Sequence, residues 1–598
     1  MNFEFICRAV RIAVIGVTLL FSASCITVNE EIGENFIPTD QKWDVYPQEQ
    51  APLTDIVLQM ADKLSGYNST RFTFGAVKDD VIGTTVKGTT FTLVPLADSL
   101  DFGTNTKVRE FHFTAARDTL STVYDYQQRI IQNVYVHPLK EALDSTVLYT
   151  GEFMSKEMSD RYLDLSRKIT EGIPVYDGGD SLSFNFSEAY AKELMDGIVR
   201  FQKLGSPKKD SLNWYLKEVP GIYITSDTPA SLGGRINMFE INLGYESGYI
   251  TGNYAELKIR ADYGERKDVD TSFVFLFGAG DFLKNLSENG EISQFAFNTS
   301  NHYYEASDLL NSEGLKTGGV KAGSEIYVEG GSGVKPVIKA AEIRAIVKKQ
   351  MEDEGISDIS EAVINKATII LPYNVNGRYD ELSKFPLILS PTVQLKSDDG
   401  KYVTYAGLTD SSISTENQGD INRSLSLYSP DISHHVQEIM KVKEDEDFEK
   451  NIAKYDIWFL IMHEEIIEKE NNSSSMDSFY QNLMYNSYYN NMMYDPYGYG
   501  YGYGGYGGYG GYGYGGYGGY GYDNYYNYYM MAAYANSYNN SSSEESTIEL
   551  DKDRYYRCTL NGPKYIEYTD WEKLTKDLKE QLPRLKVTFS APMTAERK

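Results

Sequence analysis

Residues 255–262 alternate strictly between apolar and charged side chains. Because successive side chains of a β-strand point to opposite faces of a sheet, this alternation puts one face in a core and the other in water. After turn-forming residues at 264–270, the apolar run at 273–277 predicts a second strand. The two segments therefore predict an antiparallel hairpin, and other strands must cover its apolar face.

Further short runs are rich in strand-forming residues, at 89–93, 110–113, 221–225, 236–243, 367–371, 402–405, 457–462 and 585–589. Amphipathic helices are predicted at 187–204, at 340–353 with an end at Gly355, and at 433–443 with Ser433 as N-cap. Many short strands and few helices predict a β-rich (α+β) chain with an antiparallel β-sandwich-type body.

Residues 471–546 break this pattern, and positions 497–522 contain only glycine and tyrosine. Glycine has the largest backbone entropy, and the segment offers few aliphatic side chains to bury, so we expect a disordered insertion. Its tyrosines could form a flexible contact loop that binds rings weakly and multivalently; the alternative is a solvated insertion without such a role. The tyrosines assigned to this loop are Tyr497, Tyr503, Tyr506, Tyr509, Tyr512 and Tyr517.

The amino terminus has the layout of a secretory signal. Arg8 and Arg11 precede an apolar run at 12–21 that is too short to span the ~30 Å hydrocarbon core of a bilayer as a helix. Small residues then lead to Cys25 as in a bacterial lipobox, so we expect removal of residues 1–24 and acylation of Cys25. Acyl chains would hold the protein on a membrane without a spanning segment. The alternative is ordinary cleavage beside an incidental cysteine.

Cysteine usage and net charge limit the compartments in which the protein can reside and the partners that it can bind. Once Cys7 is removed and Cys25 is acylated, Cys558 is the only thiol, which excludes an intramolecular disulfide. Glu30 and Glu31 resemble the export tag of Bacteroidota surface lipoproteins, which favours the cell surface slightly over the periplasmic face of the outer membrane. The formal net charge of −28 repels polyphosphate, so nucleic acid is excluded as a partner.

No sequence motif selects a catalytic or metal site. His463 lacks the second histidine of a zinc protease helix, and the adjacent His434 and His435 would point about 100° apart on a helix. No G-x-S-x-G nucleophile elbow occurs. Three other histidines are isolated in the sequence: His112, His137 and His302. We therefore predict no catalytic residue, metal or cofactor, although abundant carboxylates leave a hydrolase with an unrecognised acidic pair open.

Six segments together resemble one family, at 31–38, 233–235, 327–335, 364–367, 431–437 and 584–587. On them the chain resembles the Bacteroidota lipoprotein family labelled domain of unknown function four-two-seven-zero. The resemblance covers nearly the whole mature chain except the Tyr/Gly-rich segment. It implies an envelope lipoprotein with a β-rich body, and it carries over no catalytic residues.

The most specific of these motifs is the GGxGxK turn, with Gly330, Gly331, Gly333 and Lys335. Its glycines permit positive φ angles, so a tight hairpin or a bulge is expected between neighbouring strands. A structural turn and a backbone-lined contact surface for a partner both fit these residues. The sequence does not separate the two interpretations.

These inferences divide the chain into a signal peptide (1–24), an acylated tether (25–50), a mixed α/β region (51–220), a β-rich domain (221–470 and 547–598) and a disordered insertion (471–546). The first functional hypothesis is a non-enzymatic outer-membrane lipoprotein that binds or scaffolds protein partners as an accessory subunit of an envelope assembly, secretion or uptake complex. The second is a surface glycan-binding lipoprotein with aromatic platforms such as Trp43 or Trp214.

Overall fold

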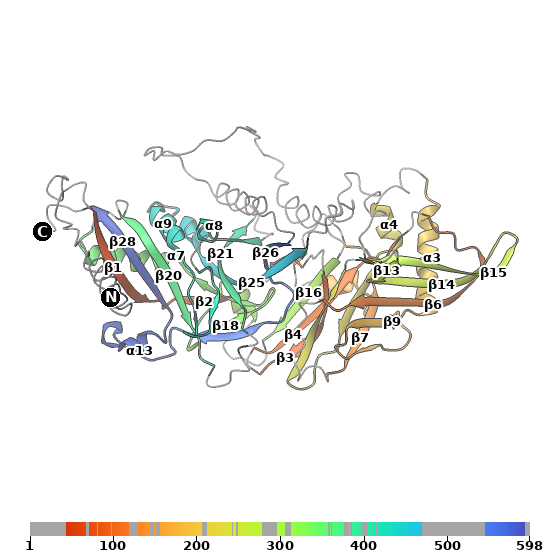
Figure 1. Ribbon diagram of the computed structural model, residues 1–598, viewed down its shortest axis with the longest axis horizontal. Helices are drawn as coiled ribbons and strands as arrows, with labels where there is room; N and C mark the ends of the chain where they lie inside the picture. Colours follow the sequence, from red (N-terminus) through yellow and green to blue (C-terminus); the bar gives the residue numbers. More distant parts are fainter. Residues whose placement is uncertain are drawn as a thin grey trace, which may run out of the picture.

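Figure 1 shows the computed structural model. It describes residues 43–592 except 62, 67–70, 81, 97–98, 119–129, 144–148, 151–155, 206–211, 242, 247–248, 278–295, 305–311, 357–358, 360–361, 376–381, 383–384, 397–402, 414–416 and 469–543. The predicted signal peptide, Cys25 and the tyrosines assigned to the contact loop lie outside the described residues.

Two large hydrophobic cores divide the described chain into two bodies that lie end to end along the long axis (Figure 1). We call residues 71–303 the inserted body, because the chain enters and leaves it from the other body. That other body, the base body, comprises residues 43–60 and 312–592.

In the described part of the chain, the base body is built on two antiparallel sheets, with strand orders β1-β28-β20-β24-β23 and β17-β2-β19-β25-β21-β22. Strand β26 pairs with β25, and β18 pairs with β27. The strands are β1 (Trp43–Pro52), β2 (Ile56–Met60), β17 (Val320–Lys321), β18 (Glu325–Glu329), β19 (Val334–Ile338), β20 (Val363–Pro372), β21 (Ile388–Lys396), β22 (Val403–Gly407), β23 (Ile421–Asn422), β24 (Leu427–Tyr428), β25 (Ile457–Glu468), β26 (Glu544–Leu550), β27 (Arg557–Asn561) and β28 (Arg584–Pro592). The helices are α6 (Ser312–Lys316), α7 (Ala340–Asp353), α8 (Asp410–Ile413), α9 (Ser433–Lys441), α10 (Phe448–Ile452), η6 (Ala453–Tyr455), η7 (Trp571–Lys573) and α13 (Lys576–Lys579).

The inserted body has one sheet in the order β11-β3-β4-β10-β7-β8, with β16 paired to β4, and a second in the order β5-β15-β14-β6-β9. The described strands are β3 (Arg71–Lys78), β4 (Thr84–Phe91), β5 (Val94–Pro95), β6 (Thr104–Ala116), β7 (Gln132–Pro138), β8 (Val175–Tyr176), β9 (Ser181–Asn185), β10 (Ile222–Ser226), β11 (Gly233–Glu240), β12 (Leu243–Glu246), β13 (Tyr249–Gly252), β14 (Tyr254–Tyr263), β15 (Arg266–Leu276) and β16 (Ala296–Tyr303). Its described helices are α2 (Lys156–Tyr162), α3 (Glu188–Gln202) and α4 (Leu212–Glu218). The two sheets contribute to one core, which confirms the predicted β-rich, antiparallel sandwich-type architecture.

The hairpin predicted from residues 255–277 is confirmed, since β14 and β15 pair from Ala255 opposite Phe275 to Tyr263 opposite Arg266. The turn is shorter than expected, because residues 266–270 already belong to β15. An ion pair between Arg260 and Asp270, 2.6 Å from Nη2 to Oδ2, holds these charged positions in the ladder. Charged side chains on the solvent face are therefore compatible with strand here.

The predicted helices are also present, as α3, α7 and α9. Ser187 caps α3 by accepting a hydrogen bond from the Tyr190 amide at 3.3 Å, and Gly355 ends the α7 region with φ +75°. The expected N-cap role of Ser433 is wrong, because Ile432 holds the cap position of α9. The Ser433 hydroxyl instead accepts a hydrogen bond from the Ala367 amide of β20 at 2.8 Å, so it ties the helix to the sheet.

The boundary expected at residue 220 falls inside the inserted body. Strand β10, which follows it, pairs with both β4 and β7, which precede it. Strands β1 and β2, from the start of the described chain, complete sheets of the base body instead. Side-chain periodicity identifies strands but not their pairing partners, so it did not separate these two bodies.

Aromatic rings fill the core of the inserted body. Phe113 of β6 lies 4.5 Å from Phe184 between ring centroids, and 6.3 Å and 6.4 Å from Phe91 and Phe72 of the opposite sheet. Phe113 is fully buried. The sandwich is thus held by rings that span both of its layers.

We expect Phe113→Ala to lower the free energy of unfolding by about 3–5 kcal/mol, because it removes a ring that both sheets contact and leaves a cavity. Urea unfolding followed by circular dichroism would measure the loss. Thr114→Ala, on the opposite face of the same strand, should change stability far less. Equal losses for the two variants would contradict the role of Phe113 in the core.

Candidate functional site

The GGxGxK turn joins β18 and β19, but the structure does not place these strands in a hairpin. Strand β18 pairs with β27, and β19 pairs with β2 and β25, so the turn carries the chain from one sheet to another. Gly331 has φ +56°, a conformation that favours glycine. A Cβ atom on Gly330 would lie 2.7 Å from the carbonyl oxygen of Arg554, so this glycine permits close backbone approach.

Lys335 is buried, and its side chain folds back onto the turn that precedes it. Its ammonium donates to the carbonyl oxygens of Glu329 at 2.5 Å and Gly333 at 3.1 Å. Burial lowers the pKa of Lys335 to about 7, repulsion from Lys87 acts in the same direction, and attraction to Glu329 opposes them. These contacts support the structural interpretation of the motif, with Lys335 fixing the shape of the turn.

We expect Lys335 to make stability depend on pH. Between its folded pKa of about 7 and its usual value of 10.5, the unfolded chain holds more of this proton, so the free energy of unfolding rises with pH across that window. Lys335→Met should remove up to about 1.4 kcal/mol of this rise per pH unit. Denaturation midpoints measured from pH 7 to 10 would test it, with the exposed Lys396→Met as the matched control. An unchanged slope in the Lys335 variant would contradict the burial of a titrating amine.

Buried charged groups also join the two bodies. We call this contact the seam: it lies where β3, β4 and β16 of the inserted body meet the turn 330–333 and the segment 551–554 of the base body. Lys87 of β4 is buried, and its ammonium donates to the carbonyl oxygens of Lys552 and Asp553, each at 2.7 Å. Burial lowers the pKa of Lys87, although Asp553 and Asp551 oppose that shift. A charged side chain from one body is therefore solvated by backbone of the other.

Ion pairs reinforce the seam on either side of Lys87. The buried Arg71 guanidinium lies 3.0 Å from Asp118 within the inserted body and 3.9 Å from Asp553 across the seam. Arg557 of β27 lies 3.0 Å from Asp79, which follows β3. Removing one partner of a buried pair leaves an uncompensated charge and costs about 3–5 kcal/mol. The seam therefore resists separation of the bodies.

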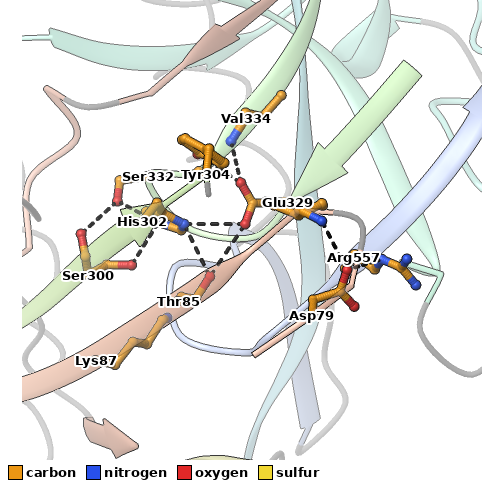
Figure 2. Close-up of polar contacts among 12 residues, drawn as sticks. Asp79, Thr85, Lys87, Ser300, His302, Tyr304, Glu329, Ser332, Val334 and Arg557 are labelled. Carbon is orange, nitrogen blue, oxygen red and sulfur yellow. Dashed lines mark hydrogen bonds and ion pairs between the residues drawn. The ribbon is translucent and has the colours of Figure 1, made fainter. Parts of the chain in front are cut away.

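His302 of β16 stands at the centre of the seam, between hydroxyls and a carboxylate (Figure 2). Its Nε2 atom lies 3.0 Å from the Ser300 hydroxyl and 3.3 Å from the Ser332 hydroxyl, and its Nδ1 atom lies 3.3 Å from Glu329 Oε1. These four residues are buried. Strand β16 supplies the histidine, whereas β18 and the GGxGxK turn supply the carboxylate and Ser332.

Glu329 is held as a carboxylate by several donors. Burial by itself would raise its pKa, but His302, the amide of Val334 at 3.1 Å and the hydroxyl of Tyr304 at 2.9 Å bring the pKa below its ordinary value. The Thr85 hydroxyl is also directed at it, at 3.5 Å. The group is thus an ionised, fully bonded anchor on the base-body side of the seam.

A serine, a histidine and an acidic residue in this order have the connectivity of a serine hydrolase triad. The serine is too inaccessible for that chemistry in this structure. The Ser332 residue is 3% exposed, and the cavity that Ser300 and Ser332 help to line has a volume of about 20 Å³. Such a cavity holds about one water molecule, so an acyl substrate does not fit. In this conformation the arrangement fastens the two bodies together.

We expect a fluorophosphonate probe to leave Ser332 unmodified in the folded protein, because the hydroxyl is buried in a water-sized cavity. Peptide mass spectrometry after incubation would measure the adduct. A purified serine hydrolase in the same reaction serves as the positive control. An adduct on Ser332 that disappears in His302→Gln would show instead that the serine is an accessible, activated nucleophile.

Four of the other histidines have structural contacts. The Nδ1 atom of His112 lies 2.8 Å from the side chain of Asn185, and His137 contacts the Arg167 carbonyl at 2.8 Å. Burial lowers the pKa of His435 to about 4, and its ring contacts a backbone carbonyl. His434 and His435 both direct their amides at Asp410, which fixes the start of α9. Among the residues that the structure describes, no three His, Cys, Asp or Glu side chains converge to hold a metal ion.

The sequence did not reveal the seam. His302, isolated in the sequence, is joined to Glu329 and Ser332 only through pairing of β16 with β4 and of the bodies with each other. The one local signal was the glycine on each side of Ser332, which marks a tightly packed turn. Of the predicted aromatic platforms, Trp43 is exposed, and Trp214 is partly buried with the Lys217 ammonium 4.6 Å from its ring centroid.

None of the helices in the described ranges has the length and apolar character needed to cross a membrane. Comparisons with protein-family models, with curated proteins and with solved structures found no match to this chain.

Proposed function

We propose that this protein is a non-enzymatic outer-membrane lipoprotein that scaffolds or binds partners as an accessory subunit of an envelope assembly, secretion or uptake complex. Its anchor would be the acyl chains on Cys25, and we propose its membership in the four-two-seven-zero lipoprotein family on the motifs quoted above. The cell surface is slightly favoured over the periplasmic face, on the acidic residues behind the lipid cysteine.

The observation that carries the proposal is the seam. Its central ionisable side chains, Lys87, His302 and Glu329, are buried and bonded to one another or to backbone, as Lys87 is to the carbonyls of Lys552 and Asp553. Groups that perform acid–base chemistry need access to a substrate. The buried side chains of the seam lack that access, because they contact groups of the other body instead. A fixed two-body arrangement suits a scaffold, which holds partner surfaces at a constant separation.

The Tyr/Gly-rich insertion would serve this scaffold as a flexible contact arm. Its described flanks pair with each other, since β25 and β26 are in register from Met462 opposite Leu550 to Glu468 opposite Glu544. The ends of the insertion therefore meet at one point of the base body. A short turn can replace the segment without changing the sheet.

The test is affinity purification of the lipidated protein from mildly solubilised outer membranes, with mass spectrometry of partners and of the Cys25 peptide. We expect an acylated Cys25 and one defined membrane complex at fixed stoichiometry. A Cys25→Ser chain should leave the membrane fraction while keeping its circular dichroism spectrum. A monomer without stoichiometric partners would overturn the subunit proposal.

A second variant tests whether the Tyr/Gly-rich insertion contributes to partner binding without contributing to folding. Replacing residues 471–543 by a short turn leaves β26 (Glu544–Leu550) intact and still paired with β25, so it should preserve cooperative unfolding, and it should weaken recovery of the partner. Loss of folding would contradict the assignment of this segment as an insertion. Full partner recovery would show that the bodies alone make the contact.

A further inference from the structure

The outer face of the β1-β28-β20 sheet carries three exposed apolar side chains around Ser590, which is itself buried and donates a hydrogen bond to Asn365 at 2.8 Å. Trp43 and Val45 of β1 lie on one face, two residues apart, and Val45 and Val363 both pair with Ser590 of the central strand. Their exposed fractions are 44%, 65% and 47%. Three large apolar side chains thus gather on one face, and we call them the end patch.

The opposite face of this sheet is core. Tyr46 stacks on Phe589 with ring centroids 5.0 Å apart, and Phe589 and Ala591 are fully buried in the base body. The exposure of the end patch is therefore a property of one face only. The core-facing side chains of these strands cannot turn outward and cover the end patch, because the alternation of side chains along a strand fixes the face on which each one lies.

Charge is segregated on the same sheet. The chain has 85 acidic and 57 basic residues, yet β20 and β28 contain no Asp or Glu. Lys366 pairs with Thr588, and Lys586 lies two positions before Thr588 in β28, so both lysines belong to the outer face. The two acidic residues of β1, Asp44 and Glu49, are in register with the core-facing Ala591 and Val587.

The patch also lies where the chain approaches its proposed anchor. Residues 26–42 separate Cys25 from Trp43 and can extend over at most about 60 Å. Figure 1 shows β1 and β28 at one end of the long axis and the β14–β15 hairpin at the other. An anchored molecule can therefore bring this sheet to the lipid while its opposite end stays distant.

We infer that the end patch, with Lys366 and Lys586 beside it, is a second membrane contact, which binds the surface of a bilayer containing anionic lipid. Tryptophan favours the interface between headgroups and acyl chains, the valines insert into its apolar side, and lysines on the same face attract anionic headgroups. The inference rests on the proposed anchoring through Cys25. It fixes the orientation of the scaffold, with the inserted body projecting away from the membrane.

The experiment supplies the anchor chemically, so that it does not depend on lipidation in the cell. The mature chain, residues 25–598, is coupled through Cys25 to a maleimide lipid in vesicles of phosphatidylcholine and phosphatidylglycerol; the buried Cys558 does not compete. Brominated acyl chains in these vesicles quench tryptophan that reaches the membrane interface. We expect quenching in the wild type, loss of most of it in Trp43→Phe, and no loss in Trp214→Phe.

Two further measurements test the patch and the lysines separately. Val45→Asp, at an exposed position, should keep the circular dichroism spectrum of the wild type and lose the quenching. Exchange of phosphatidylglycerol for phosphatidylcholine should also reduce it. Absence of quenching in the coupled wild type, or quenching that persists in Trp43→Phe, would overturn the inference. Mass spectrometry of native Cys25 reports on the anchor itself, so failure of the lipoprotein proposal is distinguished from failure of the membrane contact.

Discussion

The ammonium of Lys87 is taken out of water at the contact between two bodies, and backbone carbonyls of Lys552 and Asp553 replace its hydration. A buried cation is stable only while these acceptors stay in place, because an unbonded charge in a low-dielectric interior is very costly. The relative position of the bodies is thereby specified by directional contacts. Hydrophobic burial alone would hold them together without fixing their orientation.

The same constraint explains why a histidine between serine hydroxyls and a carboxylate does not amount to an active site. His302 contacts both Ser332 and Glu329, and the amide of Val334 and the hydroxyls of Tyr304 and Thr85 also contact the carboxylate. Catalysis requires a place for substrate beside the nucleophile, and the cavity here holds about one water. The three side chains have the contacts of a catalytic triad, but their burial prevents a substrate from reaching them.

The chain path gives the seam a further role. Strands β1 and β2 belong to the base body, and the chain returns there only after the whole inserted body, residues 71–303. Contacts such as those of Arg71 and Arg557 oppose rotation of the inserted body relative to the base body. With a membrane contact on the β1-β28-β20 sheet at the far end of the base body, this rigidity would transmit the orientation of the anchor to the distal hairpin (Figure 1).

The sequence by itself determined the local elements. Alternation at 255–262 specified β14, and apolar spacing of three and four residues specified α7, because both patterns record which side chains of one segment share a face. Only the tertiary structure decided which strands pair, where the two cores divide, and that His302 meets Glu329 and Ser332. Those contacts join residues far apart in the chain, and their partners leave no periodic signal within either segment.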